Sequence, residues 1–222
     1  MTKLILTPEH LPIHSIADEA AIDADRLTPE WLRQRFSSPP IWTPESNNEE
    51  LMAAGRIFRP ASVLIPIVMR EKELTLLLTE RAAHLQQHAG QISFPGGRFE
   101  IADGSAAETA LRETEEEVGL PRSHIDILGA LPDYKTGTGY QVSPIVSLVK
   151  PPFDTVTDPG EVASVFEVPL AFLMNARHHQ RRVFQMPDGS GSRMFYAMPY
   201  QDRFIWGATA GMLRNLFHFL RA

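Results

Sequence analysis

Residues 110–120, ALRETEEEVGL, constrain the fold more than any other stretch of the chain. The stretch closes on Gly119, with Pro121 one residue further on, and this is a common way for a helix to end. We therefore expect a helix over 105–118. At about 100° per residue, its small and apolar side chains fall on one stripe that must pack on a core. The stripe holds Ala107, Ala110, Leu111, Thr114 and Val118.

The same helix carries three carboxylates on one flank of the stripe, from Glu113, Glu116 and Glu117. Like charges at this spacing repel, and the negative end of the helix dipole adds about 0.3–1 kcal/mol of cost. A local conflict of this kind indicates a functional site, and Mg²⁺ or Mn²⁺ would resolve it with hard oxygen ligands. The alternative is a solvated acidic helix end. The opposite flank is expected to hold Glu108, Arg112 and Glu115.

Composition limits the remaining classes of protein. The 222 residues are 43% hydrophobic, enough for one domain with extensions, and the absence of cysteine excludes disulfides and thiolate metal sites. A net charge of −6 with no basic run argues against binding to duplex nucleic acid. No apolar run reaches ~18 residues, so we expect no membrane span and a cytoplasmic protein.

The chain changes character at Pro60. Residues 1–59 are predicted to be an N-terminal helical extension, with short helices at 27–36 and 46–58. Residues 60–222 mix strands with few helices, which predicts a layered α/β or α+β domain. Its expected elements are hairpin strands at 61–70 and 74–81, strands at 125–131 and 140–149, a strand followed by a helix at 162–176, a hairpin turning at 187–191, and a closing helix with one apolar face at 205–220.

A glycine-rich loop, SFPGGRFEIADG, precedes the acidic helix at residues 93–104. Gly96 and Gly97 allow the backbone to approach a ligand or metal closely. Asp103 and Ser105 are candidate caps for the start of the helix. The loop alone is weak evidence, since a tight turn also explains it, but its distance from the carboxylates is specific.

Together, Gly97, Asp103 and the run Arg112–Leu120 resemble the box of the Nudix hydrolases, G-x5-E-x7-R-E-U-x-E-E-x-G-U. Asp103 stands in place of the first Glu, with one extra residue before Arg112, and Thr114 replaces a bulky apolar residue. Further segments are similar to the coenzyme A diphosphatase subgroup, so that the resemblance covers roughly residues 60–220. These segments are 76–98, 138–146, 159–170 and 205–213.

The resemblance implies an α/β/α sandwich with a mixed sheet and an acidic loop-helix-loop. It implies that Glu113, Glu116 and Glu117 bind Mg²⁺ or Mn²⁺, helped by the Gly97 carbonyl, and that Arg112 orients Glu113. A water then attacks phosphorus in line. Glu113 and Glu161 are both candidates for the base that takes the proton of this water, and the sequence does not decide between them.

The implied substrate is the diphosphate of coenzyme A or a derivative, cut to 4′-phosphopantetheine and adenosine 3′,5′-bisphosphate. Tyr140 is expected either to stack on the adenine or to belong to the core. Trp206 and the aromatic residues 195, 196 and 217 are interpreted as core, which leaves a homodimer open. The expected substrate-binding residues are Arg81, His88, Gly96, Arg98 and Tyr140.

Three other functions stay open at this point. The enzyme could act on another nucleoside diphosphate derivative, such as a dinucleotide or ADP-ribose. The chain could be a non-catalytic ligand-binding module, although such modules usually lose one of the carboxylates that this chain keeps. A purely structural acidic helix predicts no dependence on divalent metal.

Overall fold

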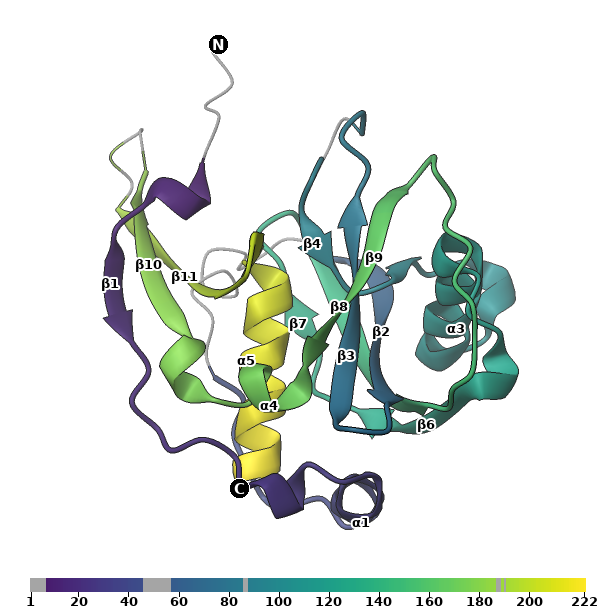
Figure 1. Ribbon diagram of the computed structural model, residues 1–222. Helices are drawn as coiled ribbons and strands as arrows, with labels where there is room; N and C mark the ends of the chain where they lie inside the picture. The colour runs from purple at the N-terminus through teal and green to yellow at the C-terminus, as the bar shows by residue number, and fades with distance from the viewer. Residues whose placement is uncertain (1–6, 46–56, 86–87, 187–188, 190) are drawn as a thin grey trace.

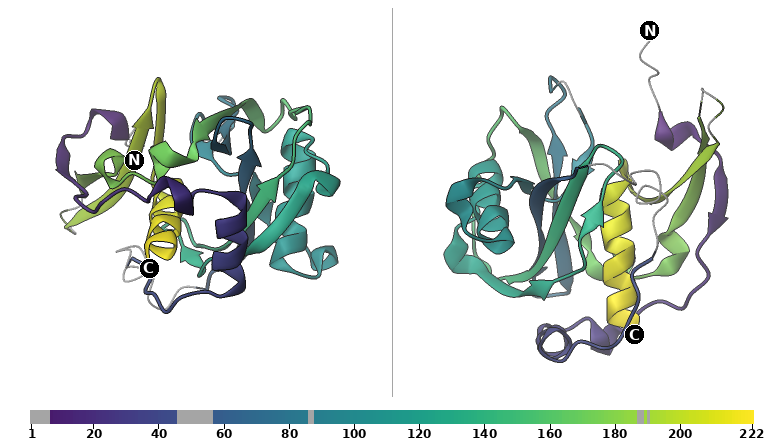
Figure 2. Two further views of the ribbon diagram at one scale, coloured as in Figure 1. Left: turned by 60° about the horizontal axis from the view of Figure 1, so that its bottom comes forward. Right: turned by 180° about the vertical axis from the view of Figure 1, so that it is seen from behind.

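Two β-sheets and the helix between them make up the body of the protein (Figure 1). The computed structural model describes residues 7–45, 57–85, 88–186, 189 and 191–222. Helix α5, Ala208–Arg221, stands between the sheets, and helix α3, Ala106–Val118, covers the outer face of the larger one (Figure 2, right). The larger sheet with α5 and α3 on its two faces confirms the predicted α/β/α sandwich.

The larger sheet is mixed, as expected. Its central strands β2 and β8 run parallel, with Arg59 opposite Tyr140, while the other pairs are antiparallel. The order is β4-β3-β2-β8-β6, with β5 pairing with β2, β7 with β8 and β9 with β3. The strands are β2 Arg59–Met69, β3 Leu74–Arg81, β4 Ile92–Ser93, β5 Gly96–Arg98, β6 Ile125–Ala130, β7 Tyr134–Lys135, β8 Tyr140–Val149 and β9 Val162–Pro169.

Strand β2 explains why this sheet needs a helix on each face. Ile65 and Ile67 belong to the core on the side of α5, whereas Leu64 and Val68 pack on the side of α3. Successive side chains of a strand point to opposite faces, so an almost continuous apolar run is buried on both. The sequence patterns at 61–70 and 74–81 are therefore confirmed as a hairpin of buried strands.

The smaller sheet has the order β1-β10-β11-β12. The predicted hairpin is confirmed, since β10 pairs with β11 and Phe184 lies opposite Arg193. The closing helix expected at 205–220 is confirmed as α5, and because this sheet covers its far side, the helix is buried on nearly every side rather than on one apolar face. The strands are β1 Ile13–Ile16, β10 Gln180–Gln185, β11 Ser192–Tyr200 and β12 Arg203–Trp206.

The N-terminal segment contributes more than helix. The helix expected at 27–36 is confirmed as α1, Pro29–Ser37, and the Thr28 hydroxyl accepts a hydrogen bond from the backbone N–H of Trp31. Strand β1 was not predicted, and the helix expected at 46–58 lies mainly outside the described residues. Buried Leu32 shares one core with α5. None of the helices in the described ranges has the length and apolar character needed to cross a bilayer.

Candidate active site

The start of α3 is set by two turns. The Ser105 hydroxyl accepts a hydrogen bond from Glu108 N at 3.1 Å, which confirms Ser105 as the N-cap. Asp103 ends the preceding 3₁₀ turn, Ile101–Asp103, and accepts from Glu100 N at 2.8 Å. Gly104, at φ 69°, lets the chain turn from one helix into the next. Asp103 therefore does not cap α3, and its carboxylate faces Arg112 instead.

Helix α3 ends against the loop at residues 151–161. Gly119 takes the left-handed conformation at φ 66° and closes the helix as predicted. The carbonyls of Glu117 and Val118 would otherwise lack partners, and they accept from Asp158 N and Val156 N, both at 3.0 Å. This loop therefore covers the negative end of the helix and leads into Glu161.

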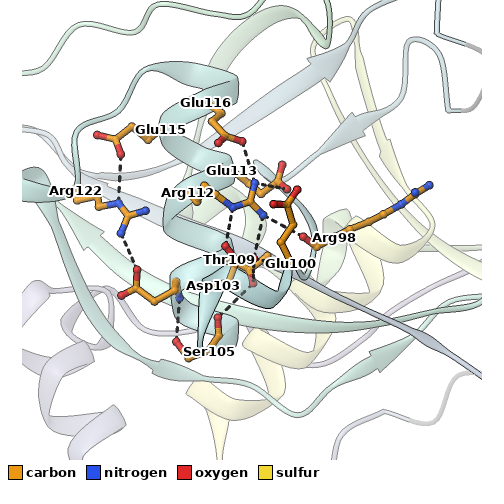
Figure 3. Close-up of polar contacts among 11 residues, drawn as sticks. Arg98, Glu100, Asp103, Ser105, Thr109, Arg112, Glu113, Glu115, Glu116 and Arg122 are labelled. Atoms are coloured by element: carbon orange, nitrogen blue, oxygen red, sulfur yellow. Dashed lines mark hydrogen bonds and ion pairs between the residues drawn. The ribbon is translucent and has the colours of Figure 1, made fainter.

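Arg112 binds four acceptors around the acidic face of α3 (Figure 3). Its Nη1 contacts Glu113 Oε1 at 3.0 Å and Glu116 Oε2 at 2.9 Å. Its Nη2 donates to the carbonyl of Arg98 at 3.1 Å, and the rest of the fork binds Asp103. The expected placement of Arg112 on the opposite flank was wrong, because its long side chain reaches the side on which these carboxylates lie.

The outer flank of α3 does behave as a solvated helix face. Glu108 and Glu115 are exposed and both pair with Arg122, at 2.7 and 3.3 Å. Exposed pairs of this kind contribute little to stability. The interpretation as a solvated acidic helix end therefore applies to these two residues.

Glu117 is the buried member of the acidic run, with 4% of its surface exposed. Burial and the nearby charges of Glu161 and Glu113 together raise its pKa to about 8, against the hydrogen bond from Gly96 N and the charge of Arg81. That bond is 3.0 Å long, and Arg81 Nη1 lies 3.9 Å from the other carboxylate oxygen. Burial also raises the pKa of Glu113, as do the charges of Glu116 and Glu161. Negative charge thus accumulates between α3 and Glu161.

A cavity of about 720 Å³ opens beside these carboxylates. Its lining residues come from distant parts of the sequence, and Arg112, Glu116 and Glu117 are not among them. The loop residue His88, which has a φ of 58°, lines the cavity, and its Nδ1 lies 2.7 Å from Gln91 Oε1. The predicted residues that line it are Arg81, His88, Gly96, Gly97, Arg98, Glu113, Tyr140 and Glu161.

Tyr140 is held by two arginines at the cavity wall. The Arg59 guanidinium lies 4.2 Å from the centre of its ring, and Arg98 Nε donates to its hydroxyl at 3.0 Å. Because Arg59 already stacks on this ring, adenine stacking on that face of Tyr140 is blocked. Arg98 is exposed, and its guanidinium is positioned by Tyr140.

The smaller sheet supplies cavity residues that the sequence did not reveal. Arg193 of β11 and Trp206 of β12 both line the cavity. Trp206 was interpreted as core, yet it is only partly buried. The sequence holds no signal for Arg193, because its place depends on how the hairpin packs across the end of α5.

The donor chemistry at this site suits a hard divalent cation. Within the described ranges, no three Asp, Glu or His side chains form a group that could hold a metal ion as they stand, and Arg112 contacts both Glu113 and Glu116. The crowding of the Glu113, Glu117 and Glu161 carboxyl groups, which raises the pKa values of Glu113 and Glu117, nevertheless favours a bound cation. A Cβ on Gly97 would meet Glu113 Oε2 at 2.5 Å, so only glycine leaves the backbone this close to that carboxylate.

Comparisons with known proteins agree with this geometry. The model of the NUDIX domain matches residues 58–186. "Uncharacterized Nudix hydrolase NudL" of Escherichia coli O139:H28 (strain E24377A / ETEC) is 40% identical over 191 residues, covering 86% of this chain and 93% of the relative. Its counterpart in strain K12 is 42% identical over 174 residues, covering 78% and 86%. Among solved structures, the M. smegmatis Nudix hydrolase RenU has a TM-score of 0.44 at 20% identity, covering 50% of this chain and 71% of that one.

Proposed function

The chain belongs to the Nudix hydrolases, a family of pyrophosphohydrolases, and from this premise we propose that it hydrolyses the diphosphate of coenzyme A or of a coenzyme A derivative. The products would be 4′-phosphopantetheine and adenosine 3′,5′-bisphosphate. The segment LLLTERAAHLQQHAGQISFPGGR, residues 76–98, resembles the coenzyme A diphosphatase signature and supports this choice. It contains nine of the residues lining the cavity beside the carboxylates, among them Arg81, His88, Gly96 and Arg98.

The observation that carries the proposal is the pairing of carboxylates and arginines in one cavity. Its volume, about 720 Å³, is in the range of pockets that hold a ligand of this class. Glu113 and Glu161 line it together with Arg81 and Arg98. The acidic part suits a cation, and the arginines suit the phosphate oxygens of the substrate.

Members of the family typically use divalent metals, and in this chain Glu113, Glu116, Glu117 and the Gly97 carbonyl would hold Mg²⁺ or Mn²⁺. Such a cation, when bound, neutralises the diphosphate and lowers the pKa of a bound water. Arg112 holds Glu113 and Glu116 in position through its ion pairs. Arg81, beside Glu117, binds a phosphate oxygen.

The proton of the attacking water goes to a carboxylate that lines the cavity, either Glu113 or Glu161. Glu161 is fixed by its backbone, since its carbonyl accepts from Ala82 N at 2.8 Å at the end of β3. Glu113 is fixed by its ion pair with Arg112. Replacing each by Gln and recording the pH dependence of kcat distinguishes them, because loss of the base removes the acidic limb of the profile.

The test is a product assay over a panel of diphosphates. The protein is incubated with coenzyme A, acetyl-coenzyme A, a dinucleotide and ADP-ribose, each with Mg²⁺ or Mn²⁺, and the products are identified by mass spectrometry. We expect 4′-phosphopantetheine, or its acyl form, and adenosine 3′,5′-bisphosphate. Preferred cleavage of a dinucleotide or ADP-ribose would support another Nudix substrate, and binding without turnover would support a non-catalytic module.

A further inference from the structure

One wall of the cavity comes from outside the matched NUDIX region, which ends at residue 186. On β11, Arg193, Phe195 and Ala197 share one face, because side chains alternate along a strand. Trp206 of β12 pairs with Ala197, and its ring packs edge-on against Phe195 with the centroids 5.4 Å apart. The smaller sheet thus presents a supported aromatic ring and a guanidinium on the side of the cavity.

The guanidinium of Arg193 has a buried donor atom, Nε, that lacks a hydrogen-bond partner among the described residues. Arg81 Nε is in the same condition, and both arginines line this cavity. A buried donor without a partner is costly, so two of them beside one cavity indicate anionic groups of a ligand that complete them.

The two arginines belong to different parts of the site. Arg81 lies on β3 of the larger sheet, beside the acidic residue Glu117, where the cleaved diphosphate must bind. Arg193 lies on the smaller sheet, where the residues described as lining the cavity include no carboxylate of that sheet. A second anion of the substrate would be attracted here, away from the repulsion of the acidic face of α3.

We propose that Arg193 and Trp206 form the subsite for the nucleotide end of the substrate. Arg193 binds a phosphate monoester that is not part of the cleaved diphosphate, which in coenzyme A is the 3′-phosphate of the ribose. Trp206 stacks on the base, a role that Tyr140 cannot fill on the face covered by Arg59. The guanidinium fork suits the oxygens of such a phosphate. This inference rests on the proposed function, and it names the residues that would make the enzyme specific for coenzyme A.

The first test compares coenzyme A with dephospho-coenzyme A, which lacks only the 3′-phosphate. Steady-state constants are measured for the wild type, Arg193→Gln, Arg193→Lys and the control Arg177→Gln, which removes a charge from an exposed residue away from the cavity. We expect Arg193→Gln to lower the ratio of kcat/KM for coenzyme A over dephospho-coenzyme A by about ten- to a hundred-fold, mainly through KM. Arg193→Lys should keep part of the ratio, and Arg177→Gln all of it. An unchanged ratio in folded Arg193→Gln overturns the proposal.

The second test does not require turnover. Calorimetry measures the binding of adenosine 3′,5′-bisphosphate and of AMP, which differ by the same phosphate. The wild type should bind the bisphosphate more tightly than AMP, and Arg193→Gln should lose that preference. Trp206→Leu should weaken the binding of both ligands to the same extent. If the preference depends on Arg193 but coenzyme A is not cleaved, the proposed substrate is wrong and the subsite stands. If coenzyme A is cleaved but the wild type shows no preference, the subsite is wrong.

Discussion

Arg112 and Asp103 form a two-pronged ion pair across the start of α3, with Nε 2.7 Å from Oδ1 and Nη2 3.0 Å from Oδ2. The hydrogen bonds from Arg112 hold the pKa of Asp103 well below its usual range. Asp103 stands where the family pattern has a Glu, one residue further from the arginine. The pair fixes the guanidinium whose remaining nitrogen contacts Glu113 and Glu116.

We expect Asp103→Asn to weaken Mn²⁺ binding by about 10–100-fold, because it releases the arginine that positions Glu113 and Glu116. Isothermal titration with Mn²⁺ measures this, and the melting temperature reports the lost ion pair. Glu108→Gln is the matched control, since it also removes a carboxylate from an arginine pair on this helix. Equal Mn²⁺ affinity in the two variants would contradict the positioning role of Asp103.

Gly97→Ala and Gly96→Ala separate function from stability. A Cβ on Gly97 would meet the Glu113 carboxylate at 2.5 Å. The flexible side chain of Glu113 can move away from it, so the substitution displaces this carboxylate without shifting the backbone. Gly96 has a φ of 152°, and a Cβ at this position would meet the Ser62 carbonyl at 2.4 Å. The backbone of one of the two strands would have to shift to make room for it. Gly97→Ala should therefore lower kcat with a small change in melting temperature, and Gly96→Ala should lower the melting temperature. Full activity in Gly97→Ala would show that the position of Glu113 is not critical.

Glu117→Gln should stabilise the metal-free protein while it abolishes turnover. The folded pKa of Glu117 is about 8 against 4.5 unfolded, so between these values the folded state holds a proton that the unfolded state releases. The free energy of unfolding therefore falls as pH rises from about 4.5 to about 8. Glutamine carries no such proton, so its advantage in melting temperature should grow over this range.

Turnover of Glu117→Gln and of Glu116→Gln should drop by orders of magnitude in folded protein, since each removes a proposed metal ligand. Glu115→Gln serves as the control, because Glu115 is exposed and pairs with Arg122. Melting scans from pH 5 to pH 8 and kcat with Mn²⁺ test the set. Retained turnover in Glu116→Gln or Glu117→Gln would exclude the ligand role of that residue.

His179 makes the protein lose stability in mild acid. Burial and the charge of Arg214 together lower its pKa to about 4 from 6.5, against the hydrogen bond to the Leu173 carbonyl. The unfolded state therefore binds a proton that the folded state does not, and the free energy of unfolding falls as pH drops from about 6.5 to about 4. Below pH 4.5 protonation of Glu19 and Glu45, which both pair with Arg214, adds to the loss.

Urea unfolding between pH 7 and pH 4.5 measures this loss. His179→Gln should flatten the slope, even if its overall stability is lower. His14→Gln should leave the slope as it is, because His14 is exposed on strand β1. The same slope in His179→Gln and in the wild type would assign the loss to other groups.

The sequence by itself determined the elements whose signals are local. The sequence predicted the helical periodicity of α3, its N-cap at Ser105 and its end at Gly119, because each depends on neighbours within a few residues. The buried strands of the larger sheet and the hairpin of β10 and β11 could be predicted for the same reason. The spacing of Glu113, Glu116 and Glu117 likewise predicted a metal site on the acidic face, and this stays a prediction.

Only the tertiary structure decided which carboxylate is buried and what surrounds it. Glu117 meets Gly96 and Arg81 because α3 packs on the outer face of the larger sheet, and Glu161 joins them through the pairing of β3 with β9. The smaller sheet brings Arg193 and Trp206 to the same cavity. Burial and charge at a site depend on contacts between residues far apart in the chain, and no local pattern in one sequence encodes those contacts.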